Sequence, residues 1–205
     1  MKRLFILSIL ALLVSPVIAA AQSHEYSPMA EKTVNYKNWS LPNVMTEQPE
    51  DLRALMAGKK LVMVVYFAPW CGNWKFEAPI AAKLYEKYKA QGFQVIGVSE
   101  YAARADVRNY FGKDGPPYPV VFESESRSDK QQTPHYQYRQ LTGDTRSWGS
   151  PWNIFLEPDK VNATGDVLLE KAWVVNGELI EEEVDKFIAS KVGGPTAGVI
   201  QPCKN

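Results

Sequence analysis

A cysteine closely follows a long apolar run in the segment from Leu61 to Pro79, LVMVVYFAPWCGNWKFEAP, and this arrangement leaves few folds open to the chain. Apolar residues 61–68 lead into Pro69, Trp70 and Cys71, and a helix-forming run begins straight afterwards. The pattern predicts a buried strand that delivers a cysteine to the N-terminus of a helix. Unpaired backbone N–H groups and the positive end of the helix dipole stabilise a thiolate there, so Cys71 is a candidate nucleophile.

Two segments resemble the thioredoxin family. Residues 67–75, Phe-Ala-Pro-Trp-Cys-Gly-Asn-Trp-Lys, resemble its active-site turn, and Pro79 matches the proline that kinks its first helix. Residues 149–151, Gly-Ser-Pro, precede the apolar run 152–156 and resemble the place where that family has a cis-proline opposite its cysteine. The resemblance implies an α/β, thioredoxin-like fold with a central mixed sheet flanked by helices.

The resemblance also implies a substrate-binding surface around Cys71. Pro151 should face the cysteine, and the backbone of Ser150 should offer strand-like hydrogen bonds to an extended peptide. The residues expected to contact a substrate are Trp70, Gly72, Asn73, Trp74, Ser150 and Pro151.

The chain departs from the family at two positions that serve release of a bound substrate. Trp74 stands where thioredoxins carry the second cysteine of Cys-x-x-Cys, and Val65 stands where many of them keep a buried acid. Both halves of the resolving step are therefore expected to be missing. Trp74 is interpreted either as part of an exposed surface or as buried packing.

Three functions fit these residues. The first is a monothiol thiol-disulfide oxidoreductase or isomerase, in which Cys71 attacks a protein or small-molecule disulfide and an external thiol reductant releases the product. The second is a redox-inactive binding or chaperone-like module that uses an apolar surface of Trp70, Trp74 and Trp152 near Pro151. In the third, Cys203 acts as a distal resolving cysteine for Cys71.

The N-terminal segment suggests export. Residues 1–21 have two basic residues, an apolar run and a terminal Ala-Ala-Ala, which is typical of a secretory signal peptide. We expect an irregular N-terminal arm over 22–50, a thioredoxin-like domain over 51–192 and a flexible tail over 193–205. The leader and the segments around Trp39 and Tyr118 resemble the exported TlpA/ResA-like branch, so a periplasmic or secreted protein without a stable membrane anchor after cleavage is predicted.

The charge balance and the histidines argue against other classes of function. The chain has 23 basic and 23 acidic side chains, so nothing favours binding of nucleic acid. The only histidines, His24 and His135, have no second ligand at metal spacing and are predicted to lie on the surface. No metal or other cofactor is expected.

The remaining pattern predicts a strand–helix–strand crossover followed by alternating elements. The expected elements are a short helix opened by 49–51, a second buried strand over 93–99, a helix over 105–111, an apolar segment over 118–122, a solvated loop over 123–133, a helical turn over 135–141, a strand over 167–175 and a last helix with Ile180, Val184, Phe187 and Ile188 on its buried stripe.

Overall fold

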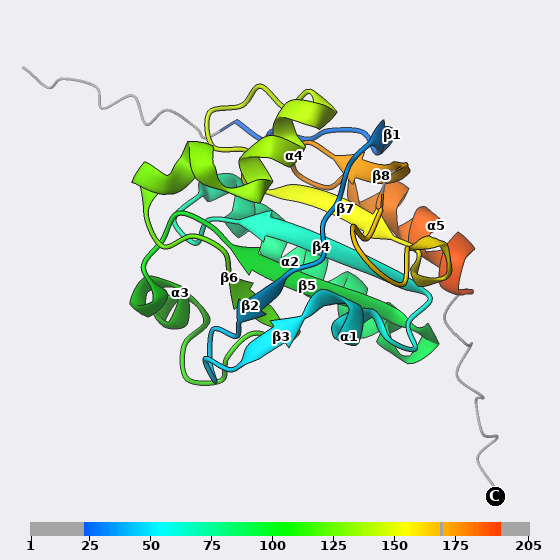
Figure 1. The fold of residues 1–205 in the computed structure, drawn as a ribbon, viewed down its shortest axis with the longest axis horizontal. Coiled ribbons are helices and arrows are strands. Elements are labelled where there is room, and N and C mark those ends of the chain that lie inside the picture. The colour runs from blue at the N-terminus through cyan, green and yellow to red at the C-terminus, as the bar shows by residue number, and fades with distance from the viewer. Residues whose placement is uncertain (1–22, 169, 194–205) are drawn as a thin grey trace, which may run out of the picture.

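The computed structural model describes residues 23–168 and 170–193 (Figure 1). The predicted signal peptide and nearly all of the predicted tail, including Cys203, lie outside the described residues. No helix within the described ranges is long and apolar enough to cross a membrane.

A six-stranded mixed sheet forms the centre of the molecule (Figure 1). Its strand order is β1-β8-β7-β4-β5-β6, with β4, β5 and β6 parallel to one another and β7 antiparallel to β4. The strands are β1 (Ala30–Thr33), β4 (Leu61–Phe67), β5 (Phe93–Ser99), β6 (Val120–Phe122), β7 (Trp152–Leu156) and β8 (Lys171–Val175). The mixed sheet and the crossover between β4 and β5 confirm the predicted fold class.

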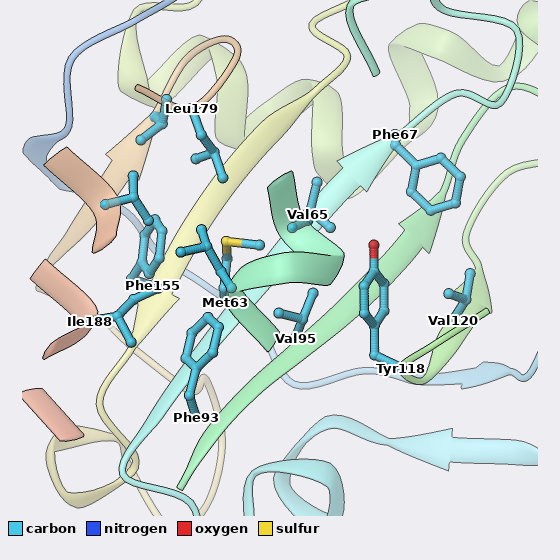
Figure 2. Close-up of a cluster of buried hydrophobic side chains, with 14 of the residues drawn as sticks. Met63, Val65, Phe67, Phe93, Val95, Tyr118, Val120, Phe155, Leu179 and Ile188 are labelled. Atoms are coloured by element: carbon cyan, nitrogen blue, oxygen red, sulfur yellow. The ribbon is translucent and has the colours of Figure 1, made fainter. Parts of the chain in front are cut away.

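Helices cover both faces of this sheet, and β4 is buried along its whole length as a result. Helices α2 (Gly72–Tyr88), α3 (Arg104–Phe111) and α5 (Glu181–Val192) pack on the face to which Met63, Val65 and Phe67 point. Figure 2 shows these three side chains in that core cluster. Helices α1 (Leu52–Met56) and α4 (Pro134–Thr142) pack on the opposite face, against Val62, Val64 and Tyr66.

Short elements complete the chain. Strands β2 (Ser40–Pro42) and β3 (Pro49–Asp51) form a separate two-stranded sheet. Three 3₁₀ turns, η1 (Lys89–Gln91), η2 (Arg127–Gln132) and η3 (Pro158–Lys160), lie in the connections. The predicted strand over 167–175 is shorter than expected, since only its second half forms β8.

The N-terminal arm is more ordered than predicted. The expectation of an irregular arm is wrong for residues 30–33, because β1 pairs antiparallel with β8 and completes one edge of the sheet. Trp39 and Leu41 do pack against the core of the domain, as expected. The prediction of a solvated loop over 123–133 is also wrong in part, since Ser124 is buried and η2 forms within this segment.

Candidate active site

Cys71 lies at the junction between β4 and α2, where the sequence placed it. It is the N-cap residue of the 17-residue helix α2 and is only half-buried. Its Sγ donates a hydrogen bond to the carbonyl oxygen of Ser150 at 3.1 Å. The Ser150 hydroxyl in turn accepts from the backbone N–H of Ala68 at 2.8 Å, and the Ser150–Pro151 peptide bond is cis. The structure therefore brings together the two segments that resemble thioredoxin.

A cavity of about 240 Å³ is lined in part by Cys71. Of the predicted contact residues, Asn73 and Ser150 line it. Gly72 is the first residue of α2, and Pro151 is buried just before β7. Gly149 of the Gly-Ser-Pro segment also lines it. The remaining lining residues besides Cys71, which the sequence did not single out, are Ser23, Glu25, Arg146, Ser147 and Trp148.

Trp70 is held beside the site by a hydrogen bond and by one cation, the guanidinium group of Arg127. Its indole N–H donates to the carbonyl oxygen of Tyr101 at 3.0 Å, and the Trp70 and Trp148 rings meet edge to face with 5.2 Å between their centroids. The guanidinium carbon of Arg127 lies 4.1 Å from the centre of the Trp70 ring, a distance at which a cation–π interaction is favourable. The Trp70 ring is therefore fixed in orientation while remaining half-exposed.

Trp74 and Trp152 are both fully buried. The ring of Trp74 stacks on Phe67 with 4.3 Å between centroids, and the Trp152 indole N–H donates to the side-chain oxygen of Asn176 at 2.9 Å. The interpretation of Trp74 as packing is therefore confirmed, and its predicted contact with a substrate is wrong. The predicted apolar surface of three tryptophans is wrong as well, since only Trp70 of the three reaches solvent.

Glu77 is a buried acid that the sequence analysis missed. Its side chain is fully buried and accepts hydrogen bonds from the backbone N–H of Leu179 at 2.8 Å and from the side-chain amide of Asn153 at 3.3 Å. Desolvation raises the pKa of Glu77 to about 8. Asn153 on β7 is the neighbour of Val65 on β4. Because Glu77 accepts from Asn153, the carboxyl group of Glu77 lies close to the strand position at which many thioredoxins carry a buried acid. Position 65 of the strand does hold a valine, and the buried acid is supplied by helix α2 instead.

A buried polar cluster lies behind Trp70, on the face covered by α4. His135 is fully buried, and its Nδ1 lies 3.0 Å from the hydroxyl of Tyr101. The prediction of a surface histidine is wrong at this position, and burial holds the pKa of His135 well below its usual range. Burial and the neighbouring carboxyl of Glu123 raise the pKa of Glu100 well above its usual range. The Glu123 carboxyl also accepts from the backbone N–H of His135 at 3.1 Å.

The loop that leads to Ser150 is anchored by a buried arginine. Arg139 Nε donates to Asp144 at 3.1 Å, and its side chain lies against the backbone of Gly149. A Cβ at Gly149 would come within 1.7 Å of Arg139 Nε, and the residue has a φ of 59°, a conformation that suits glycine. Only glycine therefore allows the loop to pass this close to the guanidinium group.

Metal binding finds no support in the described ranges, where no group of three or more histidine, cysteine, aspartate or glutamate side chains could hold an ion. His24, the second histidine, instead contacts the buried carboxylate of Glu178 at 2.7 Å and remains partly exposed, in agreement with the surface position predicted for it.

A strand that delivers a half-exposed cysteine to a helix N-terminus, opposite the Ser150 carbonyl, is the arrangement of a thioredoxin-like fold. Residues 34–145, more than half of the chain, match the family model described as Redoxin, and the chain belongs to the Redoxin family.

Individual relatives agree with this family. The chain is 44% identical over 57 residues to thioredoxin-2 of Saccharomyces cerevisiae, covering 26% of this chain and 55% of that protein. It is 27% identical over 86 residues to the thiol-disulfide oxidoreductase ResA of Bacillus subtilis, covering 41% of this chain and 48% of that one. The chain thus spans about half the length of these two curated relatives.

Solved structures support the fold. A thiol:disulfide interchange protein of the thioredoxin family from Chlorobium tepidum superposes with a TM-score of 0.52 at 22% identity. The superposition covers 79% of this chain and 98% of that one. At this level of identity the likeness concerns the fold alone.

Proposed function

We propose that this chain is an exported monothiol thiol-disulfide oxidoreductase or isomerase that acts through Cys71. The observation that carries the proposal is the position of its sulfur. Cys71 begins helix α2, its Sγ lies 3.1 Å from the Ser150 carbonyl oxygen, and Trp74 fills the interior position one helical turn further on. One accessible cysteine at a helix N-terminus suits attack on a disulfide.

The chemistry follows from the single sulfur. The Cys71 thiolate attacks one sulfur of a substrate disulfide, a mixed disulfide forms at Cys71, and the other substrate sulfur leaves as a thiolate. A thiolate from an outside thiol then attacks the mixed disulfide, so that Cys71 is released and the outside sulfur becomes part of the new disulfide. Proteins and small molecules that carry thiols or disulfides are the expected partners.

The buried indole at Trp74 favours this monothiol cycle over a dithiol cycle within the turn. A second sulfur one turn along the helix would allow intramolecular release, but the ring of Trp74 is stacked on Phe67 instead. Shuffling of disulfides or reversible capping requires one cysteine only, whereas net reduction of a disulfide within one chain requires a pair. Cys203 lies outside the described residues, and its role as a distal resolving cysteine stays a prediction.

The leader supports export of the protein. Residues 1–21 have the composition of a secretory signal peptide, and an oxidising compartment is where disulfides form and persist. A monothiol exchanger or isomerase would find its substrates in such a compartment. Fractionation of cells that express the full chain, with N-terminal sequencing of the product, would test both the cleavage after Ala21 and the location.

Alkylation at pH 6 tests the proposed nucleophile. We expect Cys71 to react with iodoacetamide faster than a model thiol peptide, and mass spectrometry should locate the adduct on this residue. The same sample treated with an excess of a small disulfide should yield a mixed disulfide at Cys71 that an added thiol removes. The variant Cys71→Ser is the control, because any labelling that persists in it belongs to another group. A Cys71 that reacts no faster than the peptide would refute the proposal.

A further inference from the structure

Two buried or half-buried guanidinium groups share one carboxylate beside the Cys71 cavity. Arg139 Nε and Arg146 Nη2 both donate to Asp144, at 3.1 and 2.7 Å, and Arg146 also donates to the carbonyl oxygen of Pro151 at 2.7 Å. The side chains of Arg139 and Asp144 are each 1% exposed, and that of Arg146 is 17% exposed and lines the cavity. Two positive charges face one negative charge here, so this cluster has an excess of one positive charge toward the cavity.

Glu25 of the N-terminal arm supplies the missing negative charge. Its carboxylate accepts from Arg146 Nη1 at 3.2 Å, and both residues line the same cavity as Cys71. The Glu25 side chain is 44% exposed, whereas that of Asp144 is buried. The carboxylate of a ligand can therefore replace Glu25 on Arg146 without disturbing the core.

The backbone around Glu25 is fixed independently of this ion pair. The N–H of Glu178 donates to the Glu25 carbonyl at 2.9 Å, and the N–H of Ser27 donates to the Glu178 carbonyl at 3.1 Å. The Glu178 carboxylate is directed to the Glu25 N–H at 2.9 Å and to His24. The arm backbone is therefore paired with Glu178, and its position does not depend on the ion pair between Glu25 and Arg146.

We infer that the Arg146 side of the Cys71 cavity is an anion subsite that receives the carboxylate of a small thiol while this thiol is joined to Cys71, and that Glu25 fills the subsite in the free protein. This inference rests on the proposed function, since it names a substrate class for the same sulfur. A cavity of about 240 Å³ is smaller than the roughly 300–1,000 Å³ of sites for drug-sized ligands, and it suits a molecule of a few heavy atoms. A guanidinium group is the usual partner of a carboxylate.

The step that the subsite favours balances as an ordinary exchange. The Cys71 thiolate attacks a symmetric disulfide RSSR whose two R groups carry carboxylates. The bond Cys71–S–S–R forms, the bond between the two R sulfurs breaks, and one R sulfur leaves as a thiolate. The retained carboxylate takes the place of Glu25 on Arg146. No oxidant other than the disulfide itself is needed.

Three symmetric disulfides of similar size test the subsite: dithiodiglycolate is anionic, 2-hydroxyethyl disulfide is neutral and cystamine is cationic. The second-order rate constant for formation of the mixed disulfide on Cys71 is measured by mass spectrometry at one pH and ionic strength. Each value is divided by that of a neutral cysteine peptide, which removes the intrinsic reactivity of the reagent. We expect the anionic reagent to exceed the neutral one by about fivefold, as a partly exposed ion pair allows.

The variant Glu25→Gln provides the sharper comparison. Removal of the competing carboxylate leaves the arm backbone in place and should raise the preference for dithiodiglycolate by a further several-fold. Glu86→Gln is the matched control, because it removes the same charge at a position on helix α2 about 20 Å from Cys71, and it should leave the preference unchanged. Circular dichroism of both variants establishes that each is folded.

The outcomes separate the two proposals. Equal normalised rates for the three reagents in Glu25→Gln would overturn the subsite and leave the monothiol function standing. Rates that never exceed those of the peptide would overturn the proposed function, and the subsite with it. A disulfide-linked Glu-Cys dipeptide should show less of the preference than dithiodiglycolate, and a larger preference for the dipeptide would assign the subsite to acidic peptides instead of small thiols.

Discussion

The free energy of unfolding should fall between pH 5 and pH 8, and the substitution Glu77→Gln should abolish most of this decrease. Glu77 is fully buried, and desolvation raises its pKa from 4.5 to about 8. Over this window the folded protein keeps a proton that the unfolded chain releases, so the free energy of unfolding falls as the pH rises. Glutamine has nearly the same shape, and its side-chain oxygen can still accept from the N–H of Leu179.

The magnitude follows from the displacement of the pKa. One pH unit of displacement corresponds to about 1.4 kcal/mol, and the displacement of Glu77 is spread over the range from pH 4.5 to about 8. Between pH 5 and pH 8 the free energy of unfolding of the unaltered protein should therefore fall by about 3 to 4 kcal/mol more than that of the Glu77→Gln variant. Other buried acids, such as Glu100, titrate in both proteins, and their contributions cancel in this difference.

Urea denaturation at pH 5, 6, 7 and 8 measures the effect. The midpoint and slope give the free energy of unfolding at each pH, and the difference between the two proteins should widen steadily with pH. The exposed variant Glu86→Gln should follow the unaltered protein at every pH. Parallel curves for Glu77→Gln and the unaltered protein would refute the reasoning, because they would mean that Glu77 is ionised in the folded state.

Three further changes test the site. Trp74→Cys should form an internal disulfide with Cys71 and gain activity in insulin reduction, and it should lose about 3–5 kcal/mol of stability in urea because a buried ring is removed; a folded variant whose two thiols both remain free to alkylation would contradict the assumed turn geometry. Gly149→Ala should be destabilised by more than 1 kcal/mol, roughly, since glycine alone suits this positive φ and its close approach to a guanidinium group; an unchanged urea midpoint would contradict this. Arg127→Ala should increase the quenching of Trp70 fluorescence by acrylamide and lower the free energy of unfolding by about 1 kcal/mol or less. Unaltered quenching would show that the guanidinium group does not shield the ring.

Local signals predicted the centre of the fold and the nucleophile. Strand β4 and the start of α2 follow from an unbroken apolar run and a helix-forming segment, and both depend on residues close in sequence. The predicted ranges 93–99 and 152–156 coincide with β5 and β7 for the same reason. The position of Cys71 therefore follows from residues close to it in sequence, without reference to Ser150, to which its sulfur donates.

Features that depend on distant partners were missed. Strand β1 pairs with a segment about 140 residues later, and nothing near it in sequence indicates that pairing. His135 is buried by Tyr66 and Tyr101, which come from other elements. Glu77 is the instructive case, since it shares the buried face of α2 with Trp74 and Ala81 at spacings of three and four residues. Helical periodicity could have shown its burial, although polarity alone suggests a surface position.

The pairing of the first strand with the last has a consequence for how the chain is made. Because β1 hydrogen-bonds to β8, residues 30–33 have no partner until residues 171–175 have emerged from the ribosome or from an export channel. Until then β7 also presents a free edge, since β8 is its neighbour on that side. Unpaired edges template contacts between chains, so the nascent protein passes through a stage that is prone to aggregation, and a holding chaperone would be of most use during that interval.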